Sequence, residues 1–285
     1  MRRRLPPALL LLLVVLLCAT LVIAVARLRT HGRSLEDWMA RLPAGDSVIV
    51  FFDLDALRPL GVLDGLALSR LSEEPEYRVF VEQTGFDARR DLRQALIAFH
   101  PEGNFFLVRG RFDWQALARY VTSQGGSCYN TFCRLTGSRP ERRISYFPLR
   151  PDVMALAVSR DSSAALMLQR RHAASGGISL PAAPLWALVP AGKLASAERL
   201  PAGTRLFAKA LSQSERLLLA VFPASNGLEV RLEVTCRSPQ QAAVLLNQLR
   251  GLTEALREMI VREGHQPNPR DLSGVLTAGV FQQRG

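Results

Sequence analysis

Alternation between apolar and polar positions divides most of this chain into short strands. Residues 47–54 form the first of them, a stretch dominated by β-branched and aromatic side chains. Asn226-Gly227 is a residue pair that favours a tight hairpin turn, so the strands on either side of it should be antiparallel neighbours. The other predicted strands are 104–109, 144–148, 153–159, 205–211, 216–222, 227–236 and 275–283.

Apolar positions spaced three and four residues apart predict helices between these strands. The clearest helix begins at Ser238-Pro239, where Ser suits the N-cap and Pro the first helical position, and it runs to about Arg262. One of its faces carries Ala242, Leu245, Leu246, Leu249, Leu252, Leu256 and Ile260. The other predicted helices are 34–41, 66–83, 87–95, 114–123, 161–172 and 270–274.

Several of these patterns occur twice at one common offset. Arg90-Asp91-Leu92 recurs as Arg270-Asp271-Leu272, and the same offset places strand 48–54 on residues 228–234. We therefore predict an internal duplication whose second copy ends early, with chance similarity of short apolar patterns as the alternative. In this interpretation Asp91 and Asp271 each cap a short helix that precedes a buried strand.

Together the elements predict an α+β fold. It consists of an N-terminal transmembrane helix followed by mostly antiparallel sheets that carry helices on one face. Residues 1–33 form the anchor or signal segment, and residues 34–175 form a first α+β domain. Residues 176–202, rich in Ala, Gly, Pro and Ser, form a linker to a second domain, 203–285, which is an abbreviated repeat of the first.

Residues 8–26 contain no charge, no Gly and no Pro, and arginines flank them on both sides. As a helix this segment is about 28 Å long, close to the roughly 30 Å hydrocarbon core of a bilayer. It therefore suits a retained single-pass anchor that binds the membrane. The alternative is a signal peptide cleaved after Ala26, which would leave the body secreted or periplasmic. The short N-terminal tail favours an extracytoplasmic body in either case.

The formal net charge of +11 raises the question of nucleic-acid binding. The basic residues are nearly all Arg, since Lys193 and Lys209 are the only lysines. They are interleaved with acidic residues and form no stripe with aromatic side chains, so nucleic acid is not an expected partner. Incidental surface charge explains them, with attraction to anionic lipid headgroups as a milder functional alternative.

Cysteine spacing adds one covalent prediction. Cys128 and Cys133 are close enough in sequence to form a local disulfide in an oxidising compartment. A zinc site is the rival interpretation, but neither a His nor a second Cys pair lies nearby in the sequence. Cys18 lies within the apolar run, and Cys236 is expected to be buried and free.

The most specific candidate for chemistry is the acidic pair Asp53 and Asp55, which follows an apolar strand. Two carboxylates at a strand end can hold magnesium, as in phosphotransfer enzymes of the haloacid-dehalogenase type. That pattern expects Thr or Val where this chain has Leu57, so a strand end with a helix cap is the competing interpretation. The four histidines are far apart, and no signature of a catalytic, cofactor-binding or metal site accompanies them.

Residues 42–125 show one resemblance to known proteins. The segments Thr84-Gly-Phe-Asp-Ala-Arg-Arg-Asp-Leu92 and Val108-Arg-Gly-Arg-Phe-Asp113 resemble bacterial membrane-anchored envelope proteins of unknown function. The resemblance implies a location in the envelope. It implies no activity, and no functional residue follows from it.

These observations favour a non-enzymatic, membrane-tethered envelope protein with an extracytoplasmic binding or scaffolding body. Its expected partners are the membrane, through residues 8–26, and an envelope protein or a lipid. Two alternatives stay open: an envelope hydrolase or phosphatase using Asp53 and Asp55, and a carrier of lipid or another apolar ligand.

Overall fold

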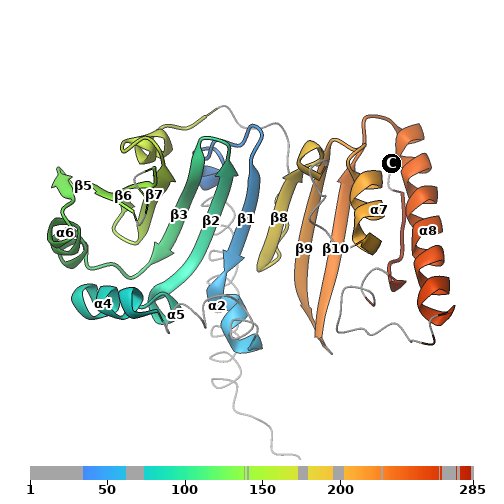
Figure 1. Ribbon diagram of the computed structural model, residues 1–285, viewed down its shortest axis with the longest axis horizontal. Helices are drawn as coiled ribbons and strands as arrows, with labels where there is room; N and C mark the ends of the chain where they lie inside the picture. Colours follow the sequence, from blue (N-terminus) through green and yellow to red (C-terminus); the bar gives the residue numbers. More distant parts are fainter. Residues whose placement is uncertain are drawn as a thin grey trace, which may run out of the picture.

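The computed structural model describes residues 35–61, 74–137, 139, 141–172, 179–194, 202–225, 227–262, 264, 274 and 277–283. Ten strands form one continuous antiparallel sheet in the order β10-β9-β8-β1-β2-β3-β7-β6-β5-β4 (Figure 1). The strands are β1 Val48–Asp53, β2 Leu92–His100, β3 Gly103–Gly110, β4 Ser127–Tyr129, β5 Phe132–Thr136, β6 Arg143–Arg150, β7 Val153–Ser159, β8 Leu185–Pro190, β9 Arg216–Ala224 and β10 Gly227–Thr235.

Helical segments connect and flank these strands. A short helix at residues 35–39 precedes β1. The others are α2 Leu54–Leu57, the 3-10 helix η1 Arg58–Leu60, α4 Pro75–Thr84, α5 Ala88–Asp91, α6 Trp114–Ser123, the 3-10 helix η3 Ala164–Gln169, α7 Ala202–Leu211 and α8 Pro239–Arg262.

One face of the sheet, here called the first face, forms the main core. Phe51 on β1 lies opposite Leu96 on β2 and Trp186 on β8, so apolar side chains of three neighbouring strands lie side by side on this face. Trp38, in the helix before β1, and Leu42, just after that helix, pack on this face together with η3. The core strand residues on this face are Ile49, Phe51, Leu96, Ala98, Phe105, Leu107, Phe147, Val153, Ala155, Ala157, Trp186, Leu188, Leu218 and Ala220.

The opposite face, here called the second face, is covered in two separate places. Over β5, β6 and β7 it is covered by α6, whose Leu117 and Val121 pack against Tyr146 and Met154. At the other end, α7 and α8 pack on each other beside β10 (Figure 1). The sheet therefore has two covered regions on this face and a single long core on the other.

This architecture corrects the predicted fold class. Helical segments pack on both faces of the sheet. Tyr146 and Phe147 are neighbours in β6 and point to opposite faces, and they belong to two different cores, each covered by helical residues. The two predicted halves share one sheet: β8 lies inside residues 176–202 and pairs with both β1 and β9. No helix among the described residues is long and apolar enough to cross a membrane, and the apolar segment 8–26 lies outside them.

The predicted internal duplication is also wrong. Strand 48–54 becomes β1 in the middle of the sheet, whereas its supposed copy becomes β10 at the edge. The expected last strand is missing too, because the described residues 277–283 form no strand. Arg270-Asp271-Leu272 lies outside the described residues. The described part of the second copy therefore does not repeat the arrangement of the first.

Local predictions failed where one pattern suits two structures. Residues 205–211 form most of helix α7 and not a strand, since their apolar positions also fit one face of a helix that packs on α8. The helix expected at 87–95 ends at Asp91, because Leu92 begins β2 and pairs with β3. The predicted helix at 161–172 contracts to the 3-10 helix η3. The segment expected to be a helix at 66–83 contains α4 from Pro75, with residues 62–73 outside the described chain.

Leu107 tests the importance of the first face, since its side chain is 0 % exposed. We expect Leu107→Ala to lower the free energy of unfolding by about 2–5 kcal/mol, because it leaves a cavity among close-packed neighbours. Urea unfolding of the purified chain measures this change. Val79→Ala on α4, where the side chain is 44 % exposed, is the control and should cost less than about 0.5 kcal/mol. Equal losses in the two variants would contradict the assignment of the core.

Candidate functional site

The acidic pair lies at the end of β1, where each carboxylate has its own protein partners. Asp53 caps α2, with its Oδ1 accepting from the Ala56 amide at 3.2 Å, and its Oδ2 accepts from Gln94 Nε2 at 2.9 Å. Asp55 forms an ion pair with Arg58. The structure therefore gives the pair the role of helix cap and surface ion pair. Within the described ranges, no three His, Cys, Asp or Glu side chains gather as ligands for a metal ion.

The hydrogen bond to Asp53 continues into the first face. Gln94 is buried, and its Oε1 accepts from Arg109 Nη1 at 2.9 Å. The guanidinium of Arg109 lies 5.2 Å from the ring centroid of Trp38, in cation–π geometry. This line of contacts joins the end of β1 to the helix that covers the core, which is a structural role.

A buried carboxylate, Asp37, lies under three arginines that the sequence patterns did not connect. Arg171 Nε donates to its Oδ1 at 2.8 Å, Arg41 Nε donates to its Oδ2 at 3.2 Å, and Arg150 Nη2 lies 3.8 Å from Oδ2. Burial raises the pKa of Asp37, but hydrogen bonds from Arg171 and Arg41 outweigh it and leave the pKa below its ordinary value. The cluster ties helix 35–39 to η3 and to the residues after it, because Arg41 Nη1 also donates to Gln169 O at the end of η3 at 2.9 Å, and Arg171 follows η3.

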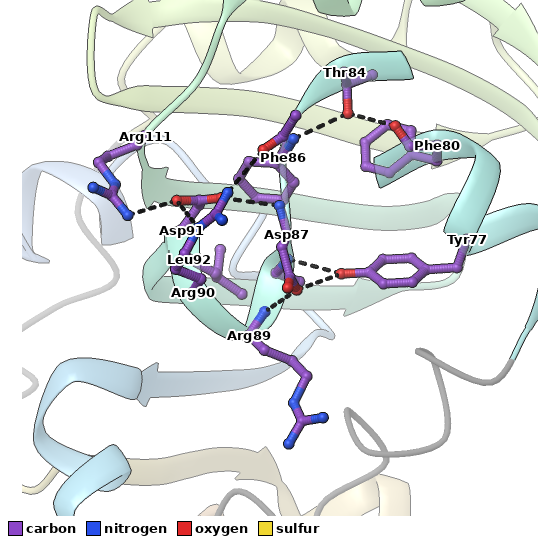
Figure 2. Close-up of polar contacts among 12 residues, drawn as sticks. Tyr77, Phe80, Thr84, Phe86, Asp87, Arg89, Arg90, Asp91, Leu92 and Arg111 are labelled. Atoms are coloured by element: carbon purple, nitrogen blue, oxygen red, sulfur yellow. Dashed lines mark hydrogen bonds and ion pairs between the residues drawn. The ribbon is translucent and has the colours of Figure 1, made fainter. Parts of the chain in front are cut away.

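The third cluster occupies the Gly85-Phe86-Asp87 segment and the residues that follow it (Figure 2). Asp91, only 4 % exposed, accepts from the Asp87 amide at 2.9 Å, from Arg90 Nη2 at 2.9 Å and from Arg111 Nη2 at 2.8 Å. Asp87 is the residue that caps α5, and its Oδ1 accepts from the Arg89 amide at 3.0 Å. Asp91 therefore closes the loop from the C-terminal end of α5, whereas the sequence predicted it to be the cap.

Side chains from α4 complete this loop. Tyr77 donates its hydroxyl proton to Asp87 Oδ1 at 3.1 Å and accepts from the Ala88 amide at 2.8 Å, as Figure 2 shows. Thr84 accepts from the Phe86 amide at 3.2 Å. The segment's polar groups thus serve the connection between α4 and β2.

Cys128 and Cys133 are joined by a disulfide across the β4–β5 hairpin, with Cα atoms 4.0 Å apart. The turn between them uses left-handed backbone at Asn130 and Thr131. Cys133 is buried beside α6, so the bond fastens the edge of the sheet to its core. Cys236 is free and half-buried, and burial raises the pKa of its thiol.

The sequence patterns did not reveal the most unusual surface, which lies on the second face of β9 and β10. The apolar strip, as we call it, consists of Leu219 on β9 and Leu228, Val230 and Leu232 on β10, which are 38 %, 49 %, 46 % and 43 % exposed. Register places Leu232 opposite Leu219. Four branched aliphatic side chains therefore share one exposed area of the sheet.

The position of α7 and α8 explains why the strip is bare. They pack on each other through Phe207, Leu245 and Leu249, and they reach the sheet at Val234 and Cys236 beyond the end of the strip. The first face of β10 carries Glu229, Arg231 and Glu233, all exposed. An alternating pattern predicts one buried side, but in β10 both sides face outward from Gly227 to Glu233.

Comparison with known proteins adds little to this picture. No family model and no curated protein matches the chain. Its fold is distantly similar to crystal forms III, IV and I of TP0453, with TM-scores of 0.42, 0.44 and 0.42 and identities of 11 %, 10 % and 10 %. These matches cover 73 %, 69 % and 75 % of this chain and 85 %, 79 % and 86 % of the TP0453 chain.

Asp91 makes the stability of the loop in Figure 2 depend on pH. Hydrogen bonds from Arg90, the Asp87 amide and Arg111 outweigh burial and lower the pKa of Asp91 to about 2. Since the unfolded value is about 3.9, the carboxylate stabilises the fold above that pH, and this contribution is lost as the pH falls toward 2. We expect Asp91→Asn to lower the free energy of unfolding by about 1–2 kcal/mol at pH 7.

Urea unfolding at a series of pH values measures this effect. The difference between wild type and Asp91→Asn should shrink between pH 5 and pH 2. Glu82→Gln, an exposed acidic position on α4, is the control and should leave the free energy of unfolding nearly unchanged at every pH. A difference between wild type and Asp91→Asn that stays constant over the whole range would contradict the assigned role.

Proposed function

We propose that this chain is a non-enzymatic envelope protein, held at the membrane by residues 8–26, whose extracytoplasmic body binds an apolar envelope component on the strip. The ligand we favour is the acyl chain of a lipid. The apolar strip is the observation that carries the proposal. Large aliphatic side chains gathered on an exposed sheet face lower the free energy when they are covered by an apolar partner.

The surroundings of the strip support a lipid as the occupant. β10 is amphipathic, with apolar side chains on the second face and Glu229, Arg231 and Glu233 on the first. A tether at residues 8–26 would keep the body close to lipid at all times. The net charge of +11 adds attraction to anionic headgroups, which favours an approach to the membrane surface.

The geometry does not favour the alternative of a hydrolase or phosphatase. Asp53 is engaged by the α2 cap and by Gln94, and Asp55 is paired with Arg58, so the two carboxylates do not converge on a shared open position. An apolar segment of an envelope protein is the other occupant that the strip could accept, and it is an outcome of the lipid experiment below.

The disulfide gives a test of the proposed extracytoplasmic location. We expect Cys128 and Cys133 to be oxidised in cells, because a compartment outside the cytoplasm maintains disulfides. Cells are quenched in acid, which stops thiol exchange, and the protein is then alkylated in denaturant at neutral pH, where thiolates react. Peptide mass spectrometry measures the state of each cysteine. Both should become alkylated only after reduction, whereas Cys236 serves as the free-thiol control. Direct alkylation of Cys128 and Cys133 without a reductant would contradict the location.

Leu219 offers a test of lipid binding, since its side chain belongs to the strip and β9 is not an edge strand. The full chain is placed in liposomes that contain a phospholipid with a photoreactive acyl chain. We expect crosslinks on the tryptic peptide Leu217–Arg231, which covers much of the strip. In Leu219→Glu they should fall about tenfold or more, because a carboxylate in contact with an acyl chain is strongly unfavourable.

The matched control is Val79→Glu, an exposed apolar position on α4 outside the strip. It should keep the wild-type level of crosslinks on Leu217–Arg231. Unchanged crosslinking in a folded Leu219→Glu variant would overturn lipid binding at the strip. So would the absence of crosslinks on this peptide in the wild type, and that result would favour a protein occupant instead.

A further inference from the structure

The outer edge of β10 is the second feature that has no partner in the described part of the chain. The sheet ends on one side at β4, which has three residues, and on the other at β10, which has nine. Every residue from Gly227 to Glu233 is exposed. A long exposed edge strand presents unpaired backbone groups to another strand.

The hydrogen-bond pattern shows which residues present them. Thr235 O accepts from the Glu215 amide at 2.9 Å, so Thr235 directs its carbonyl toward β9. Backbone groups of an antiparallel strand alternate in direction from one residue to the next. Leu228, Val230 and Leu232 therefore point their N–H and C=O groups outward, along the edge that no described strand pairs with.

We propose that β10 of a second copy of this chain pairs antiparallel with this edge, about a two-fold axis at Val230. In this register Val230 lies opposite Val230 of the other copy, and Leu228 lies opposite Leu232. Residues whose backbone N–H and C=O groups point outward therefore meet residues of the same kind and can form hydrogen bonds. On the first face Glu229 lies opposite Arg231, and symmetry makes this pair twice. The interface is self-complementary on both faces, as a two-fold interface requires.

Charge excludes the neighbouring register. An axis at Arg231 would place Arg231 opposite itself and Glu229 opposite Glu233, and like charges directly opposite each other are destabilising. An axis at Leu232 restores opposite charges but pairs Val230 with Val234, which lies under α7 and α8. The axis at Val230 confines the pairing to Gly227–Glu233, the part of the strand that is bare.

Pairing in this register also extends the surface described above. Leu228, Val230 and Leu232 of both copies would form one continuous apolar area, with a row of alternating acidic and basic side chains on the opposite face. The inference does not depend on lipid binding, because it uses the backbone edge and the charges of β10 and not the occupant of the strip.

Cysteine crosslinking in the full-length chain tests the register. In a background with Cys18→Ser and Cys236→Ser, Val230→Cys should form a covalent dimer under mild oxidation, since each new thiol lies opposite its own copy. Leu232→Cys should react at least about fivefold more slowly, because its neighbour across the interface is Leu228. Val244→Cys, exposed on α8, controls for random collision and should also be slow.

Charge reversal provides the second arm, with sedimentation of the full-length chain as the readout. Arg231→Glu should raise the dimer dissociation constant about tenfold or more, because it turns each Glu–Arg pair into a Glu–Glu pair. Glu229→Arg combined with Arg231→Glu should restore dimerisation. Circular dichroism confirms that each variant is folded.

Several outcomes would overturn the inference. They are a monomeric wild type at all concentrations, crosslinking of Leu232→Cys or Val244→Cys as fast as Val230→Cys, and an unchanged dimer in Arg231→Glu. Leu219→Glu separates this inference from the proposed function, because its side chain lies on β9. When both proposals hold, this variant loses lipid crosslinking and keeps the dimer. A wild type that crosslinks to lipid at the strip but stays monomeric shows that the dimer inference has failed, and a wild type that dimerises without these crosslinks shows that lipid binding has failed.

Discussion

Burial of the first face of the sheet is the constraint on which the rest of the structure depends. Phe51 on β1 stacks on Trp186 on β8, with ring centroids 5.6 Å apart, and both side chains are almost fully buried. This contact joins an early strand to one that lies far along the chain. In the strand order, β8 lies between β1 and the pair β9 and β10. The packing of β8 on β1 in the first-face core therefore fixes the position of β9 and β10 in the sheet.

Arginine and aspartate then organise the loops around that core. Asp37 and Asp91 are both buried, and each is surrounded by arginines that are largely exposed, except for the half-buried Arg41 beside Asp37. An exposed arginine can cover a buried carboxylate while its guanidinium stays in contact with water. The carboxylate then gains a counter-charge, and the arginine itself is hardly desolvated. The most constrained carboxylates of the described chain are therefore parts of its scaffold.

The sequence was informative where local chemistry decides the structure. The strands β6 and β7, the helix α6 and the full extent of α8 were all predicted and are confirmed. Sheet order was not predictable, because β8 comes from an Ala- and Pro-rich segment and its partners are set by tertiary packing. The exposure of Val230 could not be predicted from the sequence either, because an alternating strand has the same pattern whether or not a helix covers its apolar side. The acidic pair could be placed at a strand end, but its partner Gln94 comes from another strand.

The two ends of the sheet differ in a way that limits how copies of the chain can assemble. At one end β4 is only three residues long, and the disulfide holds it against β5. At the other end β10 is long and open. A sheet with two open edges can add copies without limit and grow into a fibre, whereas a sheet with one open edge is complete once that edge is filled. The short hairpin offers another copy only three residues of strand at this end, so growth of one sheet through both of its ends is disfavoured.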